Sequence, residues 1–244
     1  MKRKVTWNLV AQWVVILVCA LALKLYYSSA SANELRWILA PTTLFVELLS
    51  GVSFKFESHA GYINMDRSFM IAPACAGVNF MITAFLMLTA RKLLRDGSRD
   101  NAWRFIPAAA LIAYLVTLVA NTVRISVALQ LRQLPEVSSL NPYQLHRVEG
   151  IIVYFGFLLL LFVVSEKMSA GKTSGLLRQS LFPLLVYYAT VLGIPLANGG
   201  YRRGSGFWEH SALVLVIPLL LILPFAVFRW LPKRVATGSD TTGY

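Results

Sequence analysis

Charged residues are scarce in this sequence, and their scarcity decides the class of protein. They make up 14% of the 244 residues, while apolar residues make up 57%. An ordinary soluble domain has about 25% charged and roughly 45–50% apolar residues. A soluble domain is therefore excluded, and the composition is that of an integral membrane protein.

Cysteine and acidic residues are also few. Two cysteines, Cys19 and Cys75, exclude a disulfide scaffold and a cysteine-rich metal site, and we expect neither a metal nor another cofactor. The 11 acidic residues stand against 23 Lys and Arg, which gives a net charge of +12. In a soluble protein this excess would favour nucleic-acid binding, but no basic stripe is interleaved with aromatic residues. The expected partner is the lipid bilayer, with no nucleic acid.

Long apolar runs are what the sequence has instead. Six of them approach the length of about 20 residues that a transmembrane helix needs; they cover 5–27, 74–94, 103–131, 148–165, 181–198 and 211–231. The first is longer than the apolar region of a secretory signal, about 7–15 residues, and is interpreted as an uncleaved helix. A seventh run, 35–52, is less continuous because it contains Pro41, Glu47 and Gly51.

The basic residues indicate whether 35–52 crosses the membrane. If it does not, the basic residues at 2–4 and the dense basic run 91–104 share the cytoplasmic side, as the positive-inside rule requires. We therefore expect an all-α polytopic membrane protein with about six transmembrane helices, both termini in the cytoplasm, and 35–52 as an amphipathic or re-entrant segment of the outer leaflet. Residues 53–65 alternate around a turn, which predicts a short β-hairpin on the extracytoplasmic side. Residues 1–235 then form a single integral-membrane domain, followed by a disordered C-terminal tail, 236–244.

Three chemically distinctive residues fall at one depth near the outer surface in this topology: Cys75, Arg124 and His146. Pro73 is typical of a helix entry, so Cys75 is predicted to lie in the first turn of the second span. There the partial positive charge of the helix N-terminus favours the thiolate. The alternative is a small inert packing residue, which is the interpretation that fits Cys19.

Arg124 lies inside the third predicted span. A guanidinium at this depth costs roughly 2.5–3.5 kcal/mol, so it normally faces the bundle interior or water. It could instead extend to the nearby outer surface. Asn121 lies one turn earlier on the same face and could share its hydrogen bonding, and two polar groups on one face favour a functional position.

His146 follows Asn141 and Pro142, which are typical of a helix N-cap and a first helical residue, so it lies about one turn into the fourth span. Glu149 could hold the imidazole ring by a hydrogen bond. Gly150, one turn after His146, leaves room for a neighbouring helix or a substrate. The alternative is an interfacial histidine in contact with water.

Together the three side chains have the chemistry of nucleophilic acyl transfer: an attacking thiol, a cationic stabiliser and a proton shuttle. An intramembrane cysteine protease without an acceptor would use the same groups. The alternative from another class is a polytopic transport or scaffold protein in which Arg124 and His146 line a polar path. His59 and His210 are isolated in the sequence and are interpreted as structural.

Three fragments of the sequence resemble the signature blocks of the exosortase/archaeosortase family in order and spacing. They are Ala74-Cys75-Ala76-Gly77-Val78-Asn79, Asn121-Thr122-Val123-Arg124-Ile125 and His146-Arg147-Val148-Glu149-Gly150. The resemblance covers about 35–164, the expected core of the domain, and the surrounding sequence is most similar to the exosortase K-like subtype. Many exosortases carry serine after the cysteine, whereas this chain has Ala76.

The resemblance implies a multi-pass cysteine transpeptidase of the bacterial cytoplasmic (inner) membrane, with its active site facing the periplasm or the outside. Its substrates would be exported proteins with a C-terminal sorting signal, which is a short motif of the PEP-CTERM kind, a transmembrane helix and a basic end. An acceptor of unknown identity would receive them. By the same resemblance Cys75 is the nucleophile, Arg124 stabilises thiolate or oxyanion, and His146 is the general acid and base. The supporting positions are Gly77, Asn79, Asn121, Glu149 and Gly150.

Overall fold

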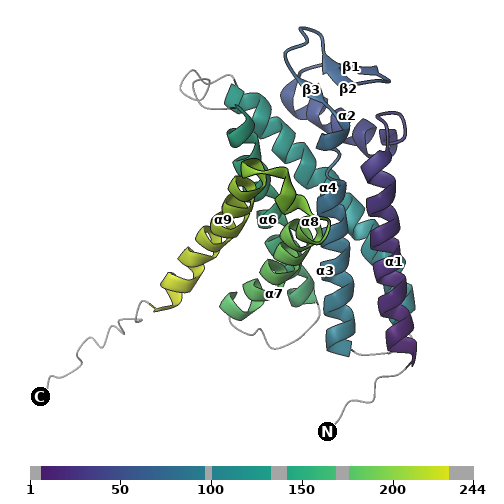
Figure 1. The fold of residues 1–244 in the computed structure, drawn as a ribbon, viewed down its shortest axis with the longest axis vertical. Coiled ribbons are helices and arrows are strands. Elements are labelled where there is room, and N and C mark those ends of the chain that lie inside the picture. Colours follow the sequence, from purple (N-terminus) through teal and green to yellow (C-terminus); the bar gives the residue numbers. More distant parts are fainter. Residues whose placement is uncertain (1–6, 97–100, 133–141, 169–175, 231–244) are drawn as a thin grey trace, which may run out of the picture.

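Helices form almost all of the chain, with a small sheet at one end of the bundle (Figure 1). The structure is a computed structural model and describes residues 7–96, 101–132, 142–168 and 176–230. The elements are α1 (Trp7–Ser29), α2 (Arg36–Ser50), β1 (Phe54–Glu57), β2 (Gly61–Asn64), β3 (Met70–Ile71), η1 (Pro73–Cys75), α3 (Val78–Asp96), α4 (Asn101–Arg132), α6 (Pro142–Met168), α7 (Leu176–Tyr188), η2 (Ala189–Gly193), α8 (Ile194–Ala197), η3 (Gly200–Arg203) and α9 (Ser205–Trp230). The predicted tail 236–244, the basic residues at 2–4 and Asn141 lie outside the described residues.

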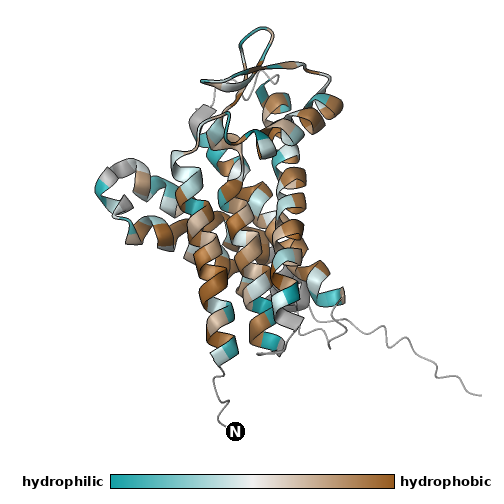
Figure 2. Ribbon diagram, turned by 90° about the vertical axis from the view of Figure 1, so that its right-hand side faces the viewer, coloured by the Kyte–Doolittle hydropathy of each residue, from teal (hydrophilic) through white to brown (hydrophobic). Residues whose placement is uncertain are grey.

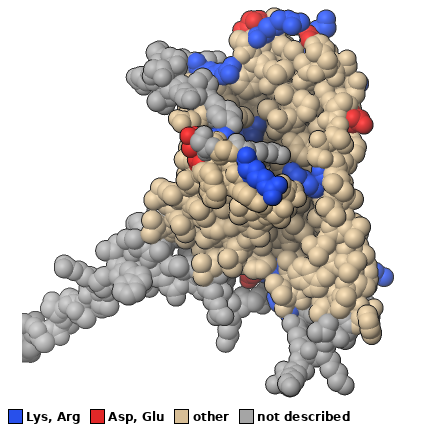
Figure 3. All heavy atoms as spheres, in the orientation of Figure 1, with Lys and Arg blue, Asp and Glu red and all other residues tan. Residues whose placement is uncertain are grey.

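Six helical stretches of the described chain are long and apolar enough to cross a membrane, which confirms the predicted number. They are Trp7–Ser29, Pro73–Arg95, Trp103–Arg132, Gln144–Met168, Ser180–Ala197 and Gly206–Leu223. Apolar residues dominate the middle of these helices, and hydrophilic residues lie toward both ends of the bundle (Figure 2). The space-filling view accordingly shows a broad surface over the bundle with few charged atoms (Figure 3). This is the surface of a multi-pass membrane protein.

Segment 35–52 forms α2, which lies beside the sheet and is too short to be among the candidate spans (Figure 1). One face of α2 buries Ile38, Leu39 and Val46 in the core. The opposite face exposes Leu44 and Leu48, which are 54% and 73% accessible. An apolar face turned outward on a helix too short to be a candidate span fits the predicted amphipathic segment.

The end of α2 is tied directly to the sheet. Gly51 caps the helix in the left-handed conformation, with φ of 70°, and donates its N–H to the Glu47 carbonyl. The Glu47 carboxylate accepts the Phe54 N–H at 2.6 Å. Gly51 and Glu47, which interrupt the apolar run in the sequence, are therefore the residues that stop α2 and start β1.

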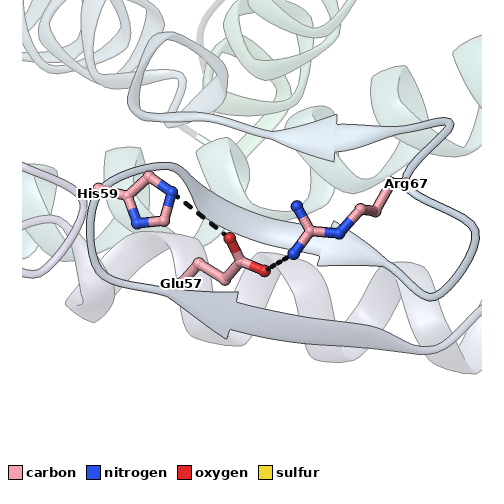
Figure 4. A network of polar contacts seen from close by, with 3 residues as sticks. All are labelled: Glu57, His59 and Arg67. Carbon is pink, nitrogen blue, oxygen red and sulfur yellow. Dashed lines mark hydrogen bonds and ion pairs between the residues drawn. The ribbon is translucent and has the colours of Figure 1, made fainter.

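The predicted hairpin is present, and a third strand extends it. β1, β2 and β3 form an antiparallel sheet in that order, with Phe56 opposite Tyr62. Glu57 accepts a hydrogen bond from Arg67 at 2.6 Å and lies 3.5 Å from His59 Nε2 (Figure 4). His59 thus belongs to the polar contacts of the hairpin, as expected for a structural residue.

Helix α3 contacts α1, α4, α6 and α7 and occupies the middle of the bundle. Its buried side chains include Val78, Ala84 and Met87. The chain reaches α3 from the sheet through β3 and η1, while α4 ends and α6 begins at the same end of the bundle (Figure 1). Arg132, the last residue of α4, donates to the Ser68 carbonyl between β2 and β3 at 2.6 Å. This end of the bundle therefore gathers segments that are far apart in the sequence.

Candidate active site

Cys75 is the last residue of η1, a single 3₁₀ turn that begins at Pro73. The second candidate span begins at Pro73, so Cys75 lies in its first turn as predicted, but this turn is 3₁₀ and α3 itself begins only at Val78. Gly77 separates the two elements with φ of 72°, a conformation that cannot continue a right-handed helix. The half-buried thiol thus sits on a turn in front of α3 rather than inside its first turn.

Gly77 has a second reason to be glycine. A Cβ at this position would lie 3.1 Å from Thr117 Cγ2, 3.3 Å from Tyr154 Oη and 3.4 Å from Asn121 Cγ. The positive φ and the close approach of α4 and α6 together disfavour any larger residue at position 77. Gly77 therefore allows the Cys75 turn to pack directly against both helices.

Arg124 points into the bundle instead of extending to the surface, since only 6% of it is exposed. Its guanidinium lies 5.2 Å from the centre of the Tyr154 ring. Its Nε and Nη2 are buried and make no hydrogen bond within the described part of the chain. Its side chain also passes 3.9 Å from the place where a Cβ of Gly150 would be. The space that Gly150 leaves is thus taken by Arg124.

His146 lies about one turn into α6, which begins at Pro142 as predicted. Its Nδ1 is 3.7 Å from Glu149 Oε2. The His146 side chain is 46% exposed and the Glu149 side chain 5%. The second carboxylate oxygen of Glu149 is buried without a hydrogen-bond partner among the described residues. A buried carboxylate therefore stands behind an accessible imidazole.

Cys75, Arg124 and His146 meet at this end of the bundle. The Cys75 thiol is close enough to the His146 imidazole and to the Arg124 guanidinium to interact with both side chains. Glu149 is close enough to Arg124 to interact with its charge. The three predicted side chains thus come from η1, α4 and α6 to a single cluster of a thiol, an imidazole and a guanidinium.

Two further polar residues support the cluster: Asn121, which is predicted from the sequence, and Tyr154, which is not. Asn121 is fully buried and donates its Nδ2 to the Cys75 carbonyl at 2.5 Å. Tyr154 donates its hydroxyl to Asn121 Oδ1 at 3.0 Å, and its ring stacks on Phe80 with centroids 4.9 Å apart. Tyr154 lies two turns after His146 on α6, so a search for polar residues along the His146 face could have found it. Asn121 therefore holds the backbone of the cysteine turn.

A cavity of about 260 Å³ adjoins this cluster. Arg124, His146, Gly150 and Tyr154 line it, and Cys75 is bracketed there by its lining neighbours Ala74 and Gly77. Asn79 and His210 complete its polar wall, so His210 is not the isolated residue that the sequence suggests. Cys19, by contrast, is exposed on α1 rather than packed inside the bundle.

Within the described ranges, His, Cys, Asp and Glu do not gather in a group of three that could hold a metal ion. The site is therefore described by its side chains alone: one thiol, one imidazole backed by a carboxylate, and one buried guanidinium.

The fold and the cluster define a multi-pass membrane protein with a cysteine, a histidine and an arginine at one end of its helices. The profile of the transmembrane exosortase family (Exosortase_EpsH) matches residues 2–164, which contain all three, and the chain belongs to this family. No curated protein and no solved structure gives a significant match.

Proposed function

We propose that this protein is a membrane cysteine transpeptidase that removes the C-terminal sorting signal of exported proteins and transfers them to an acceptor. One observation carries the proposal: in a member of the exosortase family, the Cys75 thiol lies within reach of both His146 and Arg124. A thiol, a base and a cation that meet from three separate elements are what acyl transfer requires.

In the first half-reaction Cys75 Sγ attacks the scissile carbonyl carbon and its proton passes to His146. The negative charge that develops on the carbonyl oxygen is stabilised by the Arg124 guanidinium, which is held in a largely dry position. The C–N bond then breaks, His146 gives the proton to the leaving amine, and a thioester on Cys75 remains. Glu149 keeps the imidazole oriented through Nδ1.

In the second half-reaction an amine or hydroxyl of the acceptor attacks the thioester carbon. Its proton moves to His146, the C–S bond breaks, and the Cys75 thiol is restored by that proton. Attack by water in place of the acceptor gives simple proteolysis. A substrate held in the membrane by its own helix is already oriented toward the site, which lowers the entropy cost of the first step.

We further propose that the sheet end, and with it Cys75, faces the periplasm or outside of a bacterial inner membrane. The support is the excess of Lys and Arg in the regions that this orientation leaves in the cytoplasm, such as Arg91 and Lys92 near the end of α3. The choice of a bacterial inner membrane rests on the similarity of the sequence to the exosortase K-like subtype. A reporter fused after Arg95 should register the cytoplasm; a periplasmic signal would overturn this orientation.

The decisive experiment uses an exported reporter followed by a PEP-CTERM-like motif, a transmembrane helix and a basic end. We expect the unmodified chain to remove the signal, and the Cys75→Ala variant to leave the reporter uncut in the membrane. Cys19→Ala is the matched control, because Cys19 is exposed on α1 away from the cluster. Normal processing by correctly inserted Cys75→Ala protein would contradict the proposal.

The same assay separates the two alternatives. An adduct at the new C-terminus, detected by mass, supports a transpeptidase, whereas a bare carboxylate indicates an intramembrane protease. A transport or scaffold protein would keep its function in the Cys75→Ala variant and lose it in Arg124→Ala.

A further inference from the structure

A second cavity, of about 540 Å³, lies next to the first. Asn79, Thr83, Val191 and His210 line both cavities, so they form a common wall. The second cavity is also lined by Lys24 of α1 and by residues from η2, α8 and α9. Two adjoining cavities beside one thiol offer separate places for two reactants.

Lys24 gives the second cavity a cation without an acidic partner. Its Nζ donates to Asn79 Oδ1 at 2.7 Å and lies 5.6 Å from the centre of the Tyr27 ring. In the described part of the chain no carboxylate lies within ion-pair distance of Lys24. An ionisable residue inside a membrane span carries a cost and is normally functional. The missing counter-ion is therefore the first indication of a ligand.

The rest of the lining is consistent with an anion. The second cavity has no Asp or Glu among its lining residues. His210 stands in the common wall with its Nδ1 buried and without a hydrogen-bond partner among the described residues. Ser28 and Thr190 add hydroxyl groups to the second cavity. A carboxylate or phosphate would supply the opposite charge that Lys24 lacks.

We propose that the second cavity is the acceptor site and that it binds an acceptor carrying an anionic group, a phosphate or a carboxylate. This inference rests on the proposed transpeptidase function. With the anion held near Lys24, the amine or hydroxyl of the acceptor approaches the thioester across the common wall. Its nitrogen or oxygen bonds to the acyl carbon as the C–S bond breaks, and its proton returns to the Cys75 sulfur through His146.

The test compares two amines of similar length on the full-length purified protein. Thioester formed from the test substrate is offered O-phosphoethanolamine and ethanolamine at equal concentration, and the two adducts are quantified by mass. We expect the phosphorylated amine to be preferred by roughly tenfold, the effect of one close charge pair. In Lys24→Met the preference should fall to about onefold, and Lys24→Arg should keep it.

Lys55→Met is the matched control, since Lys55 is an exposed lysine of β1 outside both cavities; it should keep the preference. The ratio of two products is independent of how much variant folds. The source of the anion is separated in proteoliposomes of phosphatidylethanolamine and phosphatidylcholine with O-phosphoethanolamine outside. An adduct with the lipid would show that the anionic group belongs to a lipid headgroup, and an adduct with the soluble amine would show that it belongs to a free phosphate compound. Formation of either adduct must depend on Lys24.

Equal use of the two amines, or an unchanged ratio in Lys24→Met, would overturn the proposal. The proposal would also be overturned if Lys24→Met kept the ratio of the two adducts but formed the thioester slowly. Lys24 would then bind the donor peptide. Failure of the transpeptidase function itself has a different signature, namely the absence of any thioester on Cys75.

Discussion

The two adjoining cavities differ in how their charges are balanced. In the first, the buried Arg124 lies near the buried carboxylate of Glu149, and His146 stands between that carboxylate and the thiol. In the second, Lys24 is bound to a neutral amide of Asn79. A cavity with paired charges can move protons and stabilise a transient anion. A cavity with an unpaired cation is suited to binding a ligand that carries a permanent negative charge. Changes in the first cavity should therefore affect bond cleavage, and changes in the second should affect the choice of acceptor.

The largest effect is expected from His146→Ala. Without the imidazole neither the thiol nor the leaving amine has its proton carrier, and cleavage of the test substrate should fall by about 10²–10⁴-fold. Single-turnover cleavage measures this loss. His59→Ala is the control, since His59 contacts Glu57 in the hairpin away from the thiol, and its rate should stay within about twofold. Equal losses in both variants would indicate a general effect on folding.

Arg124→Met should follow, with a loss of about 10²–10³-fold in kcat, the range for one removed donor to an oxyanion. Arg124→Lys keeps the charge and should recover part of the rate. Arg36→Met, on the exposed start of α2, is the matched control. If Arg124→Met raises KM and leaves kcat unchanged, Arg124 binds the substrate instead of stabilising the reaction.

Glu149→Gln tests whether the carboxylate positions His146. The amide cannot favour the charged imidazole, so kcat should fall about tenfold while KM stays the same. Glu149→Asp should recover part of the loss, and Glu57→Gln in the hairpin should have no effect on kcat. A change in KM alone would mean that Glu149 shapes the binding surface and does not act through His146.

The sequence predicts the fold well because membrane burial has a simple signature. The six apolar runs and the interrupted segment 35–52 became six candidate spans and α2. The position of Cys75 was less predictable, since Pro73 starts either a 3₁₀ turn or an α-helix, and the break depends on Gly77 packing against distant helices. β3 also escaped prediction, because a strand of two residues has no period of its own.

The site is half predictable for a similar reason. A buried arginine carries a large and local cost, so Arg124 stands out in the sequence. Tyr154 does not stand out, because a tyrosine in an apolar helix is common and its role appears only when α4 brings Asn121 to its hydroxyl. His210 and Lys24 likewise gain meaning only from the cavities that they line. Contacts between segments more than 30 residues apart leave no pattern in the sequence.

The smallest effect, from Tyr154→Phe, makes the finest distinction. Phenylalanine keeps the ring beside Arg124 and Phe80 but removes the hydroxyl that donates to Asn121. One hydrogen bond contributes about 0.5–1.5 kcal/mol, so kcat should fall roughly two- to tenfold as the Cys75 turn loosens. Tyr114→Phe is the matched control, because its hydroxyl donates to a carbonyl of α2 at 2.9 Å.

Both tyrosine variants lose one hydrogen bond between elements, so thermal unfolding should shift by a similar amount. Only Tyr154→Phe should slow cleavage, because only its bond leads through Asn121 to the backbone of the nucleophile. Its preference between the two amines should stay that of the unmodified chain, since Tyr154 lines the first cavity and not the second. Equal kinetic losses in the two variants would show that the rate follows the stability of the bundle, and the distinction between a cleavage cavity and an acceptor cavity would then lose its support.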